Sequence, residues 1–302
     1  MDASTGSAGK ATDMEREASH RLTIFELEEV APDSFRGPNW NIGWPRVFGG
    51  QVMAQALYAA AKTVAPGRPP HSLHLYFILT GDADFPYISY DVERIRDGGS
   101  FSTRRVLAKQ GERAIFSMAA SFQAVEEGFE HQVAMPDVPP PEGLLGGNEA
   151  KERYLDNAPE GTRHYWNQEP LIEFRPVEFP ARSDTHEVPP PQHIWVKPQT
   201  TLPDDPLLHQ AVLAYASDIT LLDTALITHG RSMLDPDFLG ASLDHAMWFH
   251  RPFSFNDWVL FTHSSPNASG GRGLSWGNFF TRDGTLVAST AQEGLLRVKA
   301  RK

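Results

Sequence analysis

The sequence predicts an α+β fold in which two tandem units each wrap an antiparallel sheet around a long central helix. Two observations carry this prediction. The second half of the chain repeats the first at an offset of 172 positions, so that Phe77 matches Phe249 and Gly98-Gly99 matches Gly270-Gly271. Each half also contains one long apolar helix signal followed by several strand-like runs. A repeat that keeps its register through several strands indicates a duplicated domain.

The helix of the first half is expected from about Gly49 to Val64. It is rich in alanine, has no glycine or proline after its first turn, and ends before Pro66-Gly67. Its apolar residues cover almost the whole circumference, which is typical of a buried helix.

The equivalent helix of the second half is expected over Leu207–Ser217. Gln51 and Gln210 match here at an offset of 159. Because the offset is 172 further along the chain, the connection from helix to sheet has gained residues in the second half. The gain is expected within Leu221–Leu234, as a further helix and loop.

Strand-like runs separated by turn signals follow each helix. The gaps at Asp97-Gly98-Gly99 and Gln110-Gly111 are short, so they predict hairpins and an antiparallel sheet. A sheet of this kind can enclose an apolar helix, which is the hotdog arrangement, here in duplicate. The expected strands are Ser72–Leu79, Tyr87–Ile95, Phe101–Lys109 and Ala114–Gln123, with edge strands at Phe25–Val30 and Ser34–Gly37, and then Leu171–Phe179, His193–Lys197, Ala241–His250, Trp258–Ser264, Gly273–Thr281 and Thr285–Arg297.

The expected organisation has four parts. Residues 1–20 are rich in small and mixed-charge residues and are predicted to form a disordered tail. Residues 21–127 form the first hotdog unit, and residues 171–302 form the second. Between them lies a linker over residues 128–170, whose prolines make its start stiff and non-helical.

The composition excludes several functional classes. The 302 residues are 40% hydrophobic and 22% charged, which is ordinary for a globular protein. The absence of cysteine excludes disulfides, thiolate zinc sites and a cysteine nucleophile, and is compatible with a reducing compartment. A net charge of −11 without a basic face argues against nucleic-acid binding.

The sequence also carries no signal for a membrane or a secretory route. No run approaches the roughly 20 apolar residues that span a bilayer, and the N-terminus lacks an apolar signal region. A cytoplasmic protein is expected. A peroxisomal location is the alternative, although Ala300-Arg301-Lys302 does not resemble a Ser-Lys-Leu address.

The two copies differ in polarity at three matched positions. Apolar residues of the first copy become an aspartate, a serine and a glutamine in the second. Each has a structural explanation of its own, as a helix cap, a turn serine and a surface glutamine respectively. Their joint appearance in one copy points to a site rather than to scaffold. The replacements are Ala59 by Asp218, Pro70 by Ser242 and Ala120 by Gln292.

Other catalytic signatures are absent. Gly98–Ser102 comes near the Gly-x-Ser-x-Gly elbow but lacks its last glycine and lies in a hairpin turn. Gly270–Gly273 is also read as a hairpin turn, although its Arg272 could meet an anionic substrate tail. His245 and His250 are five positions apart on a strand, so they face opposite sides and are not expected to share a metal. Neither a metal nor a cofactor is predicted.

Several motifs together resemble the acyl-CoA thioesterase II (TesB-type) family. The resemblance covers the chain in order from about Leu22 to Arg297. It implies a double hotdog that hydrolyses fatty acyl-CoA to free fatty acid and coenzyme A without a cofactor, as a dimer or tetramer. It also implies a catalytic set of Asp218, Ser242 and Gln292 that holds the attacking water. The motifs are Phe48-Gly49-Gly50-Gln51-Val52, Tyr215-Ala216-Ser217-Asp218, Asp244-His245-Ala246-Met247-Trp248-Phe249-His250 and Ala291-Gln292-Glu293-Gly294.

The first copy is expected to supply the oxyanion site. Gly49 and Gly50 open a helix, where free backbone N–H groups and the helix dipole favour negative charge. The active site is then expected between the copies. His71, beside the counterpart of Ser242, could line the same cleft, or it could be an ordinary strand-entry histidine. Acyl-chain selectivity is expected to depend on apolar side chains such as Met53, Leu57, Tyr76, Phe77 and Trp248.

Two other functions fit the same fold. A hotdog enoyl-CoA hydratase carries an Asp-x-Asn-Pro signature followed by a histidine, but Tyr215–Thr220 contains no Asn-Pro. A non-catalytic acyl-CoA-binding module would bind the ligand without releasing coenzyme A. The polar triad of the second copy favours an enzyme over this module.

Overall fold

A computed structural model describes residues 22–41, 46–146, 149, 152, 171–179, 187, 189–233 and 235–298. The expected tail over residues 1–20 and most of the linker beyond residue 146 lie outside these ranges. The division into two units and a linker therefore stays a prediction at its boundaries. No helix of the described residues is long and apolar enough to cross a membrane.

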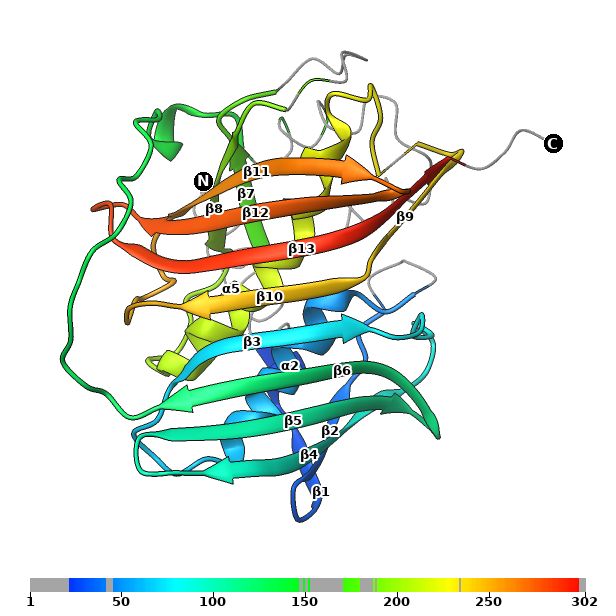
Figure 1. Ribbon diagram of the computed structural model, residues 1–302, viewed down its shortest axis with the longest axis vertical. Helices are drawn as coiled ribbons and strands as arrows, with labels where there is room; N and C mark the ends of the chain where they lie inside the picture. Colours follow the sequence, from blue (N-terminus) through cyan, green and yellow to red (C-terminus); the bar gives the residue numbers. More distant parts are fainter. Residues whose placement is uncertain are drawn as a thin grey trace, which may run out of the picture.

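The described strands form one continuous antiparallel sheet (Figure 1). Its order is β1-β2-β4-β5-β6-β3-β10-β13-β12-β11-β8-β7, and β9 pairs with β13. The first half of the sheet holds β1 (Glu28–Ala31), β2 (Ser34–Pro38), β3 (Pro70–Phe77), β4 (Tyr87–Asp97), β5 (Phe101–Gln110) and β6 (Arg113–Gln123). The second holds β7 (Ile172–Pro176), β8 (Gln192–Pro198), β9 (Phe238–Ser242), β10 (Asp244–Phe249), β11 (Val259–Ser269), β12 (Arg272–Thr281) and β13 (Leu286–Val298).

The two halves join where β3 pairs with β10. His74 lies opposite Ala246, and these two residues are themselves related by the offset of 172. The neighbouring pairs, Leu73 with Met247 and Leu75 with His245, exchange places under the same offset. The strand pairing therefore has a pseudo-two-fold axis at the His74–Ala246 pair, and the sheet register agrees with the repeat in the sequence.

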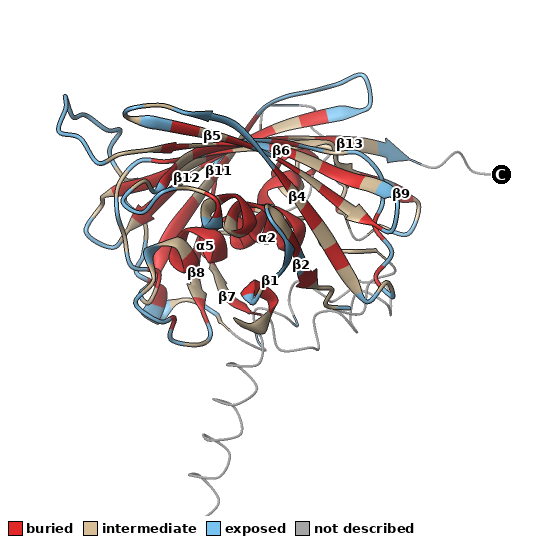
Figure 2. Cartoon of the chain, turned by 90° about the horizontal axis from the view of Figure 1, so that it is seen from below, coloured by how far each residue is buried: buried red, intermediate tan, exposed pale blue. Residues whose placement is uncertain are grey.

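The central helices α2 (Gly49–Lys62) and α5 (Pro206–Thr220) lie side by side within the concave face of the sheet (Figure 2). They run antiparallel. Phe48, before α2, packs edge-on against Tyr215 near the end of α5, with ring centroids 4.9 Å apart. At the other end the Tyr58 hydroxyl donates to the Asp205 carboxylate at 3.1 Å. The expected double hotdog is confirmed, and the start of each helix meets the end of the other.

The two helices begin in different ways. Asp205 caps α5 with its own side chain, which accepts the Leu207 N–H at 3.0 Å, and Pro206 occupies the first turn. No side chain of its own segment caps α2, whose preceding residue Phe48 is extended. The N–H groups at the start of α2 are therefore open to partners from elsewhere in the fold.

The strand expected over Ala241–His250 is two strands, β9 and β10. The register with β13 shifts by one residue between the pair Ser242–Gly294 and the pair Ala246–Ala291. Leu243 lies at the break, and its N–H donates to the Glu293 carbonyl at 2.9 Å. Such a bulge bends a strand and redirects its side chains.

The extra residues of the second half form a wall beside this bulge. They begin as the short 3-10 helix η3 (Leu221–Leu226), which follows α5 directly, and continue as a loop that leads into β9. A helix and a loop were expected there, and the helix is of the tighter 3-10 form.

Candidate active site

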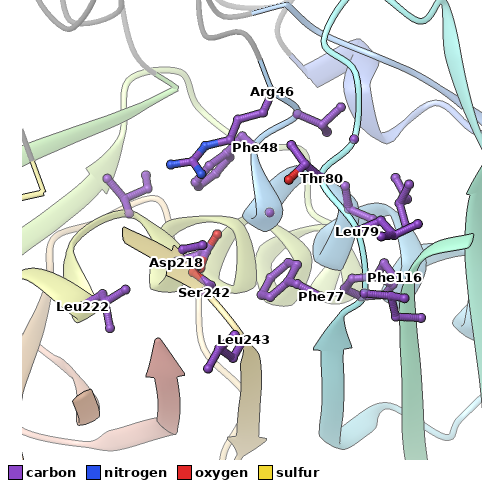
Figure 3. A pocket seen from close by; sticks show the side chains of 18 of the residues that line it. Arg46, Phe48, Phe77, Leu79, Thr80, Phe116, Asp218, Leu222, Ser242 and Leu243 are labelled. Atoms are coloured by element: carbon purple, nitrogen blue, oxygen red, sulfur yellow. Dashed lines mark hydrogen bonds between the residues drawn. The ribbon is translucent and has the colours of Figure 1, made fainter. Parts of the chain in front are cut away.

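A cavity of about 340 Å3 lies between the two units, where the start of α2 meets the end of α5 (Figure 3). Both copies contribute to its wall. The first supplies Arg46, Val47, Phe48, Gly49, Val52, Phe77, Ile78, Leu79, Thr80, Gly81, Ile115 and Phe116, and the second supplies Asp218, Ile219, Leu222, Asp223, Met233, Ala241, Ser242 and Leu243. Most of these side chains are apolar, and the polar ones are Arg46, Thr80, Asp218, Asp223 and Ser242.

Asp218, Ser242 and Gln292 meet at the wall of this cavity, which Asp218 and Ser242 line. The Gln292 Nε2 group donates to Asp218 Oδ1 at 2.6 Å and to Ser242 Oγ at 2.7 Å. Ser242 Oγ donates to the same Asp218 oxygen at 3.4 Å, which is a long hydrogen bond. The three polar replacements that distinguish the second copy are thus brought together from α5, β9 and β13. Their counterparts in the first copy are Ala59, Pro70 and Ala120, all of which are buried.

The three side chains differ in their access to the cavity. Asp218 and Ser242 line it, as Figure 3 shows. Gln292 is only 1% exposed and lies behind them. Its amide nitrogen faces both oxygens, so it holds the other two side chains in place. Gln292 is therefore not a surface residue, although a glutamine on the last strand of a sheet ordinarily is.

Asp218 lies in the last turn of α5, so it does not cap a following helix. Burial raises the pKa of its carboxyl to about 6. Hydrogen bonds from Gln292, from the Gly50 backbone N–H and from Ser242 act in the opposite direction, as does the charge of Arg46. The carboxylate is therefore ionised at neutral pH but is more basic than an exposed aspartate.

The start of α2 is built against this carboxylate. The Gly50 N–H donates to Asp218, so the acid of one copy caps the helix of the other. A Cβ added at Gly49 would lie 2.8 Å from Asp218 Oδ2 and 2.7 Å from the Phe77 ring. A Cβ at Gly50 would lie 2.7 Å from the Tyr215 carbonyl oxygen. Glycine is required here by close approach.

The structure places the two remaining expected site residues outside this cavity. His71 lies at the far end of β3 from Phe77, roughly 20 Å away at about 3.3 Å per residue. Its Nε2 lies 2.8 Å from Ser121 Oγ, and burial lowers the pKa of its ring. Arg272 is half exposed at the start of β12 and pairs with Glu293 at 2.9 Å. Neither residue is among those lining the cavity.

Arg46 was not among the expected site residues. It lines the cavity next to Phe48, and its Nη2 donates to the Gly240 carbonyl at 3.2 Å, which links the two copies. Its place just before the glycine pair, on a chain of net negative charge, is the sequence signal that could have identified it.

The residues expected to set acyl-chain selectivity lie in three different environments. Phe77 lines the cavity, whereas Met53 and Leu57 are fully buried in the core. Tyr76 and Trp248 are exposed, at 67% and 37%. Within the described residues, no group of three or more His, Asp or Glu side chains is placed to hold a metal ion.

Comparison with known proteins relates most of the chain to one family. A family model described as acyl-CoA thioesterase matches residues 164–295, and one described as acyl-CoA thioesterase N-terminal domain matches residues 36–123. Acyl-CoA thioesterase 2 of Haemophilus influenzae is 40% identical over 276 residues, covering 91% of this chain and 96% of the relative. Acyl-coenzyme A thioesterase 8 of Mus musculus is 42% identical over 286 residues, covering 92% and 88%.

A solved structure agrees with these relatives. The acyl-CoA thioesterase II TesB2 of Mycobacterium marinum superposes with a TM-score of 0.74 at 40% identity, covering 92% of this chain and 98% of that one. The match therefore extends over both hotdog units and the cavity between them. This chain belongs to the acyl-CoA thioesterase family.

Proposed function

We propose that this protein hydrolyses acyl-CoA thioesters to free acid and coenzyme A by direct attack of water. The observation that carries the proposal is the hydrogen-bonded set of Asp218, Ser242 and Gln292, of which Asp218 and Ser242 line a mostly apolar cavity and Gln292 lies behind them. Family membership and the relatives' names support the same reaction. A carboxylate with a pKa of about 6 is suited to general-base work near neutral pH.

In this reaction Asp218 accepts a proton from the water that attacks the thioester carbonyl. Ser242 lines the cavity beside it and holds the same water by a hydrogen bond. Gln292 fixes the orientation of both side chains from behind. The tetrahedral intermediate then breaks its carbon–sulfur bond. The proton held by Asp218 passes to the departing thiolate, so the products are the acid and the free thiol.

The oxyanion forms next to the start of α2. No side chain of its own segment caps this helix turn, and the helix dipole favours negative charge there. Because the Gly50 N–H already holds Asp218, Gly49 is the glycine of the pair assigned to the oxyanion. Arg46 is the cationic side chain among the described residues lining the cavity, and it adds positive potential on the same side.

The apolar wall suits a fatty acyl chain. Phe48, Phe77 and Phe116 line the cavity together with aliphatic side chains from both copies. Pockets of a few hundred Å3 with apolar walls and a few convergent polar groups are typical of small-molecule sites.

The test is thioester turnover of an Asp218→Ala variant with octanoyl- and palmitoyl-CoA, with the released thiol trapped chromogenically. Turnover is expected to fall by far more than tenfold. A variant within about tenfold of wild type, or about 1.4 kcal/mol of barrier, would contradict the role of Asp218. Asp223→Ala is the matched control, because Asp223 is a second aspartate that lines the same cavity, and its carboxylate accepts from the Met233 N–H at 3.2 Å.

Two outcomes would reject the function itself. Acyl-CoA binding by the wild type without any thiol release would indicate a binding module. Hydration of crotonyl-CoA without thiol release would indicate a hydratase.

We also propose a homo-oligomer, dimeric or tetrameric, in the cytoplasm. Exposed aromatic side chains on the outer face of the sheet, among them Tyr76, Trp248 and Trp276, support self-association. The absence of cysteine is compatible with a reducing compartment. Light scattering coupled to size exclusion tests the assembly, and a monomer at micromolar concentration would reject it.

A further inference from the structure

A second buried polar cluster lies directly behind the catalytic set. It consists of Ser217, His245 and Thr290, which are 0%, 1% and 3% exposed. The His245 Nε2 atom lies 3.0 Å from Ser217 Oγ and 2.7 Å from Thr290 Oγ1. The three side chains come from α5, β10 and β13.

This cluster is also specific to the second copy. Under the offsets of the repeat, Ser217 corresponds to Tyr58, His245 to Leu73 and Thr290 to Met118. Leu73 and Met118 are buried core residues of the first unit. The second copy has therefore gained two polar sets in neighbouring positions, and only one of them faces the cavity.

The hydrogen bonds fix the protonation of His245. Ser217 Oγ donates its hydrogen to the Ala214 carbonyl at 2.7 Å, and Thr290 Oγ1 donates to the Ala246 carbonyl at 2.8 Å. Since each hydroxyl has one hydrogen, both can only accept from the imidazole. We therefore assign the proton of His245 to Nε2, where it is shared between the two hydroxyls. Burial keeps the ring neutral by lowering its pKa to about 3, so it is a fixed donor and not an acid or base.

The cluster connects the backbone segments that carry Asp218 and Gln292. Ser217 is the residue before Asp218 in the last turn of α5. Thr290 is two residues before Gln292 on β13, so the two side chains point to the same face of the strand. His245 thus ties the end of α5 to β13 just behind the point where Gln292 Nε2 meets Asp218 Oδ1 at 2.6 Å.

We infer that His245 is a positioning residue, whose Nε2–H holds α5 and β13 at the spacing that lets Gln292 donate to Asp218. This inference rests on the proposed thioesterase function. Without the imidazole, the buried hydroxyls lose their common donor and the two elements can shift apart. Displacements of about 1 Å in a catalytic set lower rates by roughly a hundredfold.

The first test compares His245→Leu, the residue of the first copy, with His245→Gln, which keeps an N–H at a similar reach. With octanoyl-CoA, His245→Leu is expected to lower kcat by roughly tenfold to a hundredfold with KM within about twofold. His245→Gln is expected to recover most of kcat. Equal kcat values for the two variants would overturn the inference, because the donor would then be irrelevant.

A matched control separates positioning from simple loss of a buried histidine. His263 on β11 is also buried, and burial likewise lowers its pKa to about 3, but its Nε2 has a long contact of 3.4 Å with Thr220 Oγ1. His263→Leu is expected to leave kcat within about threefold of wild type. An equal loss of kcat in His263→Leu and His245→Leu would overturn the inference.

A readout without turnover keeps the inference separate from the proposed function. The pKa of the Asp218 carboxyl can be followed by carbon NMR in wild type and variants. In His245→Leu it is expected above about 6, because the bond from Gln292 that lowers it is lengthened. The other charged groups of the described cavity wall, Arg46 and Asp223, are unchanged. An unmoved pKa would overturn the inference, whereas a wild type without thiol release would reject only the thioesterase function.

Smaller variants cover the case in which His245→Leu does not fold. Thr290→Val removes one acceptor with little change in volume, and Thr290→Ser restores the hydroxyl. The valine variant is expected to raise the Asp218 pKa and lower kcat, and the serine variant to reverse both. Valine and serine variants that behave alike would contradict the positioning role.

Discussion

Replacing the Asp218 carboxyl with its neutral isostere is expected to stabilise the protein. The pKa of Asp218 is about 6 in the folded protein against an ordinary value of 3.8. The folded carboxyl therefore holds its proton more tightly than the unfolded one, and ionisation costs folding free energy as pH rises from 3.8 to about 6. The cost reaches about 3 kcal/mol above pH 6 and is about 1.6 kcal/mol at pH 5.

Asp218→Asn removes this cost at every pH, because asparagine does not ionise. Its amide can accept from Gln292, but it replaces one carboxylate oxygen with a donor, so one of the present hydrogen bonds is lost at about 1 kcal/mol. The net gain is expected near 2 kcal/mol at pH 8 and near 0.6 kcal/mol at pH 5. The difference between these gains, about 1.4 kcal/mol, does not depend on the lost bond.

The assay is urea unfolding of wild type and variant at pH 5 and pH 8, followed by tryptophan fluorescence. The pH dependence of all other groups cancels in the difference between the two proteins. The variant must also lose thioester turnover, because the amide cannot accept the proton of the water. Stability gains that are equal at the two pH values, or a variant less stable than wild type at pH 8, would refute the buried-carboxylate reasoning.

Three further outcomes are expected. The kcat/KM of the wild type should rise with pH below about 6 and level off above it, since only ionised Asp218 accepts a proton, and a flat profile from pH 5 to 8 would contradict this. Gly49→Ala places a Cβ 2.8 Å from the Asp218 carboxylate and should lower kcat by at least about tenfold. Gly99→Ala is the control and should leave kcat unchanged, because a Cβ added there meets no atom within 4 Å. Equal kcat values for the two variants would contradict the importance of the close approach at Gly49. Arg104→Met should cost about 2 kcal/mol in urea unfolding, because the buried Thr63 hydroxyl and carbonyl oxygens lose the guanidinium donors that lie 2.8 and 3.0 Å away. A loss below about 0.5 kcal/mol would show that these hydrogen bonds are dispensable.

The fold and the centre of the candidate site could be predicted from the sequence for one physical reason. A duplicated scaffold keeps the same apolar positions in both copies, so a polar residue gained in one copy stands out. Asp218, Ser242 and Gln292 were identified in this way, and the structure brings them within hydrogen-bond distance. The same comparison applied to buried positions yields the cluster around His245.

Contacts between the copies could not be read in the same way. His71 is next in sequence to Pro70, the counterpart of Ser242. The pseudo-two-fold axis at the His74–Ala246 pair places Pro70 and Ser242 at opposite ends of the β3–β10 pairing. The Gly50 N–H that caps against Asp218 comes from the other unit. Such contacts depend on how two sheets join edge to edge, and periodicity within each copy carries no information about that join.

The seam between β3 and β10 has a consequence for how the protein could be divided. Each unit taken alone would present an unpaired strand edge and the exposed side of an apolar helix, which together invite pairing with a matching partner. Two fragments produced by a cut within the linker are therefore expected to associate along the same edges. In the intact chain, the covalent connection would act mainly by raising the effective concentration of one unit near the other. Activity would return only with mixed fragments, because one brings the carboxylate and the other the helix end that meets it.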